Sequence, residues 1–353
     1  MIVTVSTVKD SLPNVQRWVG GNLASGVDHM VVMLDAAQPD LSAWLGDQPH
    51  VTVVEAYDDW WAGARPEGLN ARQITNANVV KALLTRTSWC DWLFHVDADE
   101  VARIDRAALA GAPADVRVAR LAPLEAVSRR HWEGPPTWFK RLLDDDELTL
   151  LRVLGVVERA DNEAYFHGHV RGKVGIRPAL DLGLMLHRVL DPTRTELEPW
   201  SAPGLDLLHY ESVDGEEFVR KWTAILAAGP QVALRPTREP TAVALRTLIG
   251  KGLTPEQARP YLMRIFERTT EDDFDTLRDL DLLVEVDPAA GGHEPAPLSE
   301  GAREHLAALL TAVRGEGKEP FRPGRPPERA AKALDRLGAG PRIRGARSFL
   351  RRS

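Results

Sequence analysis

The sequence predicts an α/β fold in which a mostly parallel sheet is flanked by helices. Strand-like and helix-like segments alternate through the first hundred residues, the order that right-handed crossover connections produce. Residues 29–34 form a continuous apolar run, as expected of a strand buried on both faces. A second apolar run, at 92–96, is followed directly by acidic residues. Polar side chains are therefore expected at the carboxyl ends of buried strands, where such folds bind ligands.

The individual elements follow from local patterns. β-Branched residues open the chain, and apolar residues at helical spacing then run from Ser11 to Gly26, a residue type that commonly ends helices. The predicted order is a strand at 2–6, a helix at 11–25, strands at 29–34 and 51–54, a helix at 70–87 and a strand at 92–96. Three polar sites follow strands in this scheme: Thr7 with Lys9, Asp35, and Asp97 with Asp99.

Composition and charge narrow the class of protein. A chain of 353 residues, 44% apolar and 27% charged, is typical of a folded protein, and its single cysteine, Cys90, excludes an internal disulfide. We expect an intracellular, cytoplasmic protein without a signal peptide or membrane span. Residues 318–353 hold eleven Lys or Arg against three Asp or Glu, so the rest of the −7 chain carries −15. This acidic body disfavours nucleic-acid binding.

The acidic motif after the strand at 92–96 is the strongest chemical signal. In extended backbone Asp97 and Asp99 point to one side, while the small Ala98 points away. Hard carboxylate oxygens suit Mg²⁺ or Mn²⁺, ions that complete their shells with substrate phosphates. The alternative is a helix cap and a solvated turn. The position directly after a buried strand favours the metal site.

Several short motifs, in order, resemble the nucleotide-binding half of GT-A glycosyltransferases of the family 2-like kind. The motifs are TVSTVKD at 4–10, GVDH at 26–29, HVDADE at 95–100, GKVGIRP at 172–178, LH at 186–187, LHY at 208–210 and EFVRK at 217–221. Val101 replaces the aromatic residue usual after the acidic motif. The resemblance spans about residues 2–225 and implies a GT-A-like, Rossmann-type domain at 1–225.

The resemblance also implies an activity. It implies a hexosyltransferase-like enzyme that moves a sugar from a nucleotide-sugar donor to an acceptor hydroxyl of a glycan, lipid or small molecule, with Mn²⁺ or Mg²⁺. Asp97 and Asp99 would face the ribose and the metal-bridged diphosphate, and His187 would be a third metal ligand. The remaining predicted donor contacts are Thr7, Lys9, Asp35, Arg72, Gln73 and Asn76. The donor base and sugar are not specified by these motifs.

Spacing adds further candidates for the same reaction. Lys173 and Arg177 lie on either side of Gly175 on one side of a strand, and are expected to offer positive charge to a diphosphate leaving group. Inverting transfer needs a carboxylate that takes the acceptor's proton, and Asp161 and Glu163 are the candidates. The Trp60–Trp61 pair is either a sugar-stacking surface or part of the core.

Other classes of function stay open. His167 and His169 form an H-x-H pair that, with His187 or His209, would suit a metal-dependent hydrolase. A non-catalytic nucleotide-sugar-binding module on the same scaffold is the second alternative. Both differ from a transferase in what they do to a bound donor.

The C-terminal third changes character. Repeated prolines punctuate a helical extension at 226–314, which ends in an amphipathic helix marked by Leu306, Leu309, Leu310 and Val313. Residues 315–353 form a basic tail rich in Pro, Gly and Arg, which we expect to be flexible. Its last residues, 348–352, would either solubilise the chain or contact anionic lipid at the inner membrane face.

Overall fold

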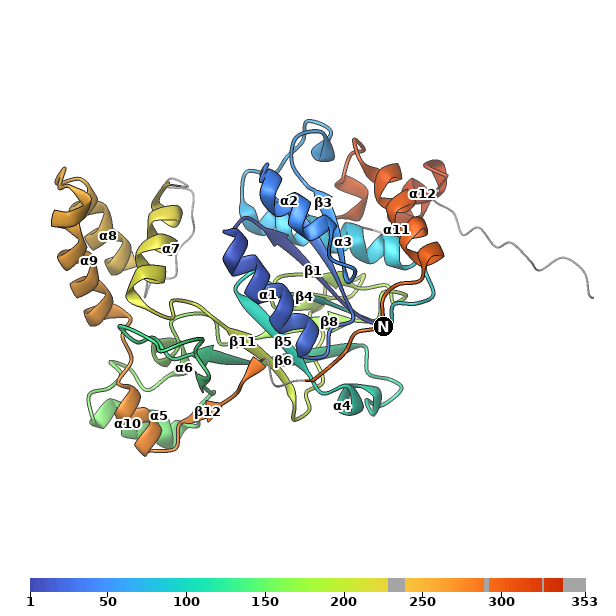
Figure 1. The fold of residues 1–353 in the computed structure, drawn as a ribbon. Coiled ribbons are helices and arrows are strands. Elements are labelled where there is room, and N and C mark those ends of the chain that lie inside the picture. The colour runs from blue at the N-terminus through green and yellow to red at the C-terminus, as the bar shows by residue number, and fades with distance from the viewer. Residues whose placement is uncertain (228–238, 289–291, 326, 339–353) are drawn as a thin grey trace, which may run out of the picture.

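The computed structural model describes residues 1–227, 239–288, 292–325 and 327–338 (Figure 1). The strands are β1 (Ile2–Val8), β2 (His29–Leu34), β3 (Val51–Glu55), β4 (Trp92–His95), β5 (Glu100–Ile104), β6 (Val118–Ala126), β7 (Trp138–Lys140), β8 (Lys173–Ile176), β9 (Gly183–Leu184), β10 (Val189–Leu190), β11 (Leu205–His209) and β12 (Leu283–Glu285). The α-helices are α1 (Leu12–Ala24), α2 (Pro39–Gly46), α3 (Leu69–Leu84), α4 (Arg106–Ala110), α5 (Asp145–Val153), α6 (Asn162–Tyr165), α7 (Gly215–Ala227), α8 (Glu239–Ile249), α9 (Pro255–Thr269), α10 (Phe274–Asp279), α11 (Glu300–Val313) and α12 (Pro327–Arg336). Short 3₁₀ helices lie at η1 (Asp58–Trp61) and η3 (Glu319–Phe321).

One ten-stranded sheet forms the centre of the molecule. Its main path runs β12-β7-β6-β8-β4-β1-β2-β3, and β11 joins β6 to β5. Strands β3, β2, β1 and β4 are mutually parallel, while β8 pairs antiparallel with both β4 and β6. The predicted α/β fold, with a mostly parallel sheet flanked by helices, is confirmed, and every predicted element of the first hundred residues is present.

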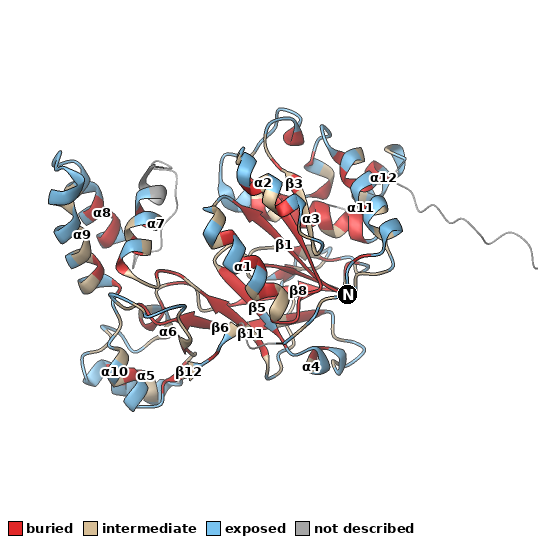
Figure 2. Ribbon diagram, viewed as in Figure 1, coloured by how far each residue is buried: buried red, intermediate tan, exposed pale blue. Residues whose placement is uncertain are grey.

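Different helices cover the two faces of the sheet. Val3 and Val5 of β1 pack on the same side as α3, whereas Ile2 and Val8 pack with α1 and α2. This alternation is the period-two pattern of a strand that is buried on both faces. Figure 2 shows the strands buried between helices whose outer surfaces are exposed. Because both faces need apolar side chains, the polar residues concentrate at the strand ends.

Strand register brings those polar ends to one edge. Val8 pairs with Leu34, and Val5 pairs with His95. The chain continues the same ladder for one residue, since the Asp35 backbone N–H donates to the carbonyl oxygen of Val8 (2.9 Å). The side chains that follow β1, β2 and β4 therefore share the carboxyl edge of the parallel strands, as predicted.

A second group of strands extends the sheet and adds charged neighbours. β11 pairs antiparallel with β5 and parallel with β6, so His209 is the direct partner of both Glu100 and Glu125. α7 follows β11 and packs with α8 and α9 through Phe218, Trp222 and Phe266 (Figure 1). β12 pairs with β7, so the predicted helical extension also contributes a strand.

The C-terminal segment differs in part from the expected flexible tail. α11 buries its predicted apolar stripe in the core beside α3, and Phe321 and Leu334 extend that core. The Lys318 ammonium group donates to the carbonyl oxygens of Val313 and Glu316 near the end of α11. The described residues between 315 and 338 therefore pack against the domain. A few apolar side chains are enough to hold this segment, because they join a core that the domain already forms. The predicted lipid contact at 348–352 lies outside the described residues.

Within the described residues, no helix is long and apolar enough to cross a bilayer.

Candidate functional site

The two aspartates that follow β4 are partly exposed and face different partners. Their side chains are 28% (Asp97) and 34% (Asp99) exposed, so neither is walled off from solvent. Asp97 accepts hydrogen bonds from Gln73 Nε2 at 2.5 Å and from Lys173 Nζ at 2.7 Å. Asp99 accepts one from Lys221 Nζ at 2.8 Å. Each carboxylate therefore has its own lysine.

Charged and imidazole side chains from distant parts of the sequence gather around these aspartates. They come from the β4–β5 connection, the loop before β8, β8 itself, β11 with the residues after it, and α7. We call this group the edge cluster: Asp97, Asp99, Glu100, His169, Lys173, His209, Glu211 and Lys221. It joins most of the motifs that carry the glycosyltransferase resemblance, although 124 positions separate Asp97 from Lys221.

The imidazole rings of two cluster residues, His169 and His209, pack together with that of a neighbouring histidine, His187. The ring of His169 lies 4.2 Å from that of His187 and 4.9 Å from that of His209, centroid to centroid. His187 Nδ1 lies 2.9 Å from the carbonyl oxygen of Gly172. Burial, reinforced by the Lys173 ammonium group, lowers the pKa of His187 to about 3. His187 is therefore a neutral imidazole at neutral pH, the form that binds metals.

The described residues contain two groups whose donor atoms lie close enough to share a metal ion. One is Glu100, His169 and His209, and the other is Asp99, His209 and Glu211. Neither contains Asp97 or His187. The Asp97–Asp99–His187 ligand set implied by the resemblance stays a prediction, and the structure adds histidine and glutamate donors beside it.

Buried charges in the cluster stabilise one another. Burial by itself raises the pKa values of the Asp97 and Glu100 carboxyl groups, but the Lys173 ammonium group and the neighbouring imidazoles together hold both below their usual values. The opposite holds for Lys173. Burial lowers the pKa of its ammonium group, and the Asp97 and Glu100 carboxylates raise it. All three groups are charged at neutral pH.

The predicted nucleoside contacts bond to one another. Arg72 donates from Nε and Nη2 to the two oxygens of Asp35, both at 2.8 Å, a bidentate pair. Asn76 Nδ2 donates to Thr7 Oγ1 at 3.0 Å, and Asn76 Oδ1 accepts from Trp60 Nε1 at 3.1 Å. These residues line the same carboxyl edge as Asp97.

The tryptophan pair belongs to the core. Trp60 and Trp61 are 0% and 1% exposed, so the sugar-stacking interpretation is wrong for both. Their indole N–H groups bond to Asn76 and to the carbonyl oxygen of Ala56, which satisfies their only polar atoms. They support the helix that carries Arg72 and Gln73.

Four further predicted site residues do not belong to the edge cluster. Arg177 stacks over the ring of Trp92 at 4.6 Å, because β8 runs antiparallel to β4 and its two ends reach opposite edges of the sheet. The placement of Arg177 therefore does not support donor binding. Asp161 caps α6 by accepting from the Ala164 N–H, and Glu163 is exposed on that helix. Lys9 is exposed beyond β1.

The H-x-H pair is divided between two environments. His169 Nε2 lies 2.7 Å from Glu100 Oε1, in the edge cluster. His167 Nε2 lies 3.1 Å from Asp272 Oδ1, beside the fully buried Lys140. The two imidazoles do not converge, so the structure does not support the hydrolase that was predicted to use them as a pair.

A second cluster of charged side chains lies next to the edge cluster. Lys140 Nζ contacts Glu125 Oε1 at 2.9 Å and Asp272 Oδ1 at 3.0 Å, and we call Glu125, Lys140, His167 and Asp272 the buried lysine cluster. Glu125 also accepts hydrogen bonds from the backbone N–H groups of His167 and Gly168, and its Oε2 lies 3.7 Å from His209 Nδ1. Glu125 thus connects the two clusters.

The buried lysine cluster predicts acid sensitivity. Burial raises the pKa of Asp272, but Lys140 and His167 more than offset this and hold it at about 2, below the ordinary 3.8. Its contribution to stability, about 2 kcal/mol, is present above pH ~4 and is lost as the pH falls towards about 2. Urea unfolding of wild type and Asp272→Asn at several pH values should show a shallower acid decline in the variant; equal slopes would contradict this.

Sequence reasoning missed Glu125, Lys140, Glu211 and Asp272. A usable signal existed for the first two, since each is a single charge in an apolar strand segment, LAPLEAV and WFK. Such charges are rarely buried unless they are paired. Nothing local distinguished Asp272, whose neighbours are themselves acidic.

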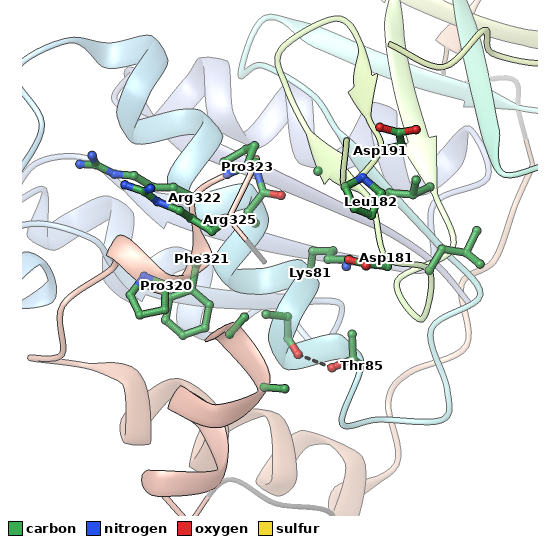
Figure 3. Close-up of a pocket in the computed structure, with 18 of the residues that line it drawn as sticks. Lys81, Thr85, Asp181, Leu182, Asp191, Pro320, Phe321, Arg322, Pro323 and Arg325 are labelled. Carbon is green, nitrogen blue, oxygen red and sulfur yellow. Dashed lines mark hydrogen bonds between the residues drawn. The ribbon is translucent and has the colours of Figure 1, made fainter. Parts of the chain in front are cut away.

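The structure also has a cavity of about 210 Å³ away from these clusters (Figure 3). It lies between α3, the 179–183 loop and the C-terminal segment at 320–325. Lys81 and Asp181 lie side by side in it, and Thr85 donates a hydrogen bond to Ala82 of the same helix. None of the predicted site residues lines it.

Comparison with known proteins does not assign a family. The sequence matches no protein-family model and no curated protein. Among solved structures the chain is similar to mannose-1-phosphate geranyltransferase from Thermus thermophilus, with 16% identity, a TM-score of 0.25, and coverage of 50% of this chain and 57% of that one. It is also similar to HddC from Yersinia pseudotuberculosis, with 12% identity, a TM-score of 0.25, and coverage of 50% and 76%. Similarities this weak establish neither activity nor substrate, and the chain spans little more than half of the first protein.

Proposed function

We propose that this chain is a glycosyltransferase that moves a sugar from a nucleotide-sugar donor to an acceptor hydroxyl with the help of a divalent cation. One observation carries the proposal. The acidic motif after β4 meets Lys173, His209 and Lys221, which come from the separate downstream motifs of the same resemblance. Motifs that are distant in sequence thus converge at the ligand-binding edge of the sheet.

The residues of the cluster suit a diphosphate. The Lys221 ammonium group donates hydrogen bonds to Asp99 and Glu211, and the fully buried Lys173 positions Asp97. A cation held beside Asp99 would supply the charge that neutralises the departing nucleoside diphosphate. The acceptor proton still needs a carboxylate; Asp161 and Glu163 stay the proposed candidates, although neither belongs to the edge cluster.

The proposal is tested with the full-length protein. Thermal unfolding is measured with UDP- and GDP-sugars, with and without Mn²⁺ or Mg²⁺, and mixtures with candidate acceptors are then analysed for free nucleoside diphosphate and glycosylated product. A cation-dependent rise in melting temperature together with product supports a transferase. Binding of a donor that is never consumed across an acceptor panel favours a binding module. Absence of any donor-induced shift contradicts the proposal.

A further inference from the structure

We propose that Glu100, His169 and His209 form a nitrogen-containing site for a divalent transition metal, next to the aspartates that follow β4. Its part in sugar transfer rests on the proposed function, but metal binding itself does not. Donor atoms from these three residues lie within 4.8 Å of one another. Ligands that share one ion, with bonds of about 2.1 Å, lie about 3–4 Å apart. To bind one ion, the hydrogen-bonded atoms of His169 and Glu100, now 2.7 Å apart, must separate, and the stacked rings of His169 and His209 must rotate so that a nitrogen of each points to the ion.

The fold builds this site from rigid parts. Glu100 and His209 are direct cross-strand partners of β5 and β11, so their positions are set by the sheet. Glu100 is fully buried and His209 is 4% exposed. The segment that carries His169 is pressed against His209, since a Cβ at Gly168 would come within 2.2 Å of the His209 ring. That glycine is what lets His169 and His209 stack.

Two ring nitrogens in the site make no hydrogen bond within the described residues. Nδ1 of His169 and Nδ1 of His209 are buried without a hydrogen bond within the described residues. Buried polar atoms of this kind are uncommon in native proteins unless a ligand or an ion uses the group. Imidazole nitrogens are ligands typical of Zn²⁺, Co²⁺, Fe²⁺ and related ions, whereas Mg²⁺ prefers oxygen. The donor set thus indicates the class of metal.

The geometry favours the Glu100–His169–His209 group over the Asp99–His209–Glu211 group. Lys221 bonds both carboxylates of the Asp99–His209–Glu211 group, at 2.8 and 2.9 Å, and so occupies the place between them. In the first group Lys173 lies 3.6 Å from Glu100 Oε2, while the other oxygen faces His169. An ion can therefore join Glu100, His169 and His209 without displacing a lysine.

The experiment uses untagged, chelator-treated full-length protein and Co²⁺ as the probe. Binding is followed by visible absorption, and nitrogen coordination is checked independently by pulsed EPR of the Mn²⁺-loaded protein. His169→Gln and His209→Gln should each weaken Co²⁺ binding at least about tenfold, given that loss of even an outer-shell partner costs this much. His167→Gln is the matched control, since it changes the other histidine of the same segment and should leave the affinity unchanged.

Each alternative result overturns the proposal. Unchanged Co²⁺ affinity in His169→Gln does so, as does a loss confined to Asp99→Asn and Glu211→Gln, or an absence of nitrogen coupling in wild type. If Glu100→Gln fails to fold, His169→Gln still decides, because its side chain is 13% exposed. A donor-induced thermal shift with Mg²⁺ is measured in parallel, so that failure of the metal site is distinguished from failure of the proposed transferase.

Discussion

Replacing Asp99 with asparagine is expected to lower sugar transfer about 10²–10³-fold while the protein stays folded. The change removes one negative charge with little change in shape, and the side chain is 34% exposed. Loss of one preorganised electrostatic contact at developing charge typically costs this much in kcat. Transfer rates are measured at saturating donor over a range of Mn²⁺ concentrations. The deficit should shrink only partly as Mn²⁺ rises, since the charge itself is missing.

The appropriate control is Asp59→Asn, which removes an exposed carboxylate on η1 that pairs with Arg314 and is not part of the edge cluster. It should transfer sugar at the wild-type rate. Asp97→Asn is a less clean variant, because it also removes the partner of the fully buried Lys173 and is expected to reduce stability. Wild-type activity in Asp99→Asn would exclude this aspartate from the reaction.

Replacing Lys140 with methionine is expected to destabilise the fold by about 3–5 kcal/mol. The substitution keeps most of the side-chain length but leaves Glu125 and Asp272 without their shared cation, and removal of one partner from a buried ionic group costs about this much. Burial lowers the pKa of Lys140, but the two carboxylates more than offset this, so the lysine is charged in the folded protein. Urea unfolding at neutral pH measures the loss.

Arg246→Ala serves as the comparison for Lys140→Met. It removes an exposed pair with Glu239 on α8, and exposed ion pairs contribute little to stability. Its unfolding midpoint should stay close to that of wild type. A loss below about 1 kcal/mol in Lys140→Met would mean that the buried lysine cluster holds less charge than its contacts indicate.

The edge cluster shows which site residues local sequence patterns predict and which they do not. Asp97 and Asp99 were predictable because an apolar run ends directly before them, and their place at the sheet edge follows from the parallel order of β1, β2 and β4. His209 was identified only as part of the LHY motif and as one possible third ligand beside the H-x-H pair. Its partnership with Glu100 depends on the register of β11 against β5, two strands that are about a hundred residues apart in sequence.

Two interpretations failed because spacing does not determine environment. Lys173 and Arg177 were expected on one side of a strand, but Lys173 begins β8 and Arg177 follows its last residue, so the antiparallel pairing with β4 brings them to opposite edges of the sheet. His167 and His169 share a short segment, yet one contacts Asp272 and the other contacts Glu100. In both cases the partner is distant in sequence, so no local pattern specified it.

Local chemistry alone accounts for the alternation of strands and helices, the apolar faces of β1 and β2, and the acidic residues after β4, since these depend on periodicity within one segment. Long-range packing assigns every partner: which lysine bonds which aspartate, which histidines stack, and which charges are buried with Lys140. Those pairings arise when strands align and bury apolar surface, and the charged groups must then find compensating partners where the sheet leaves them.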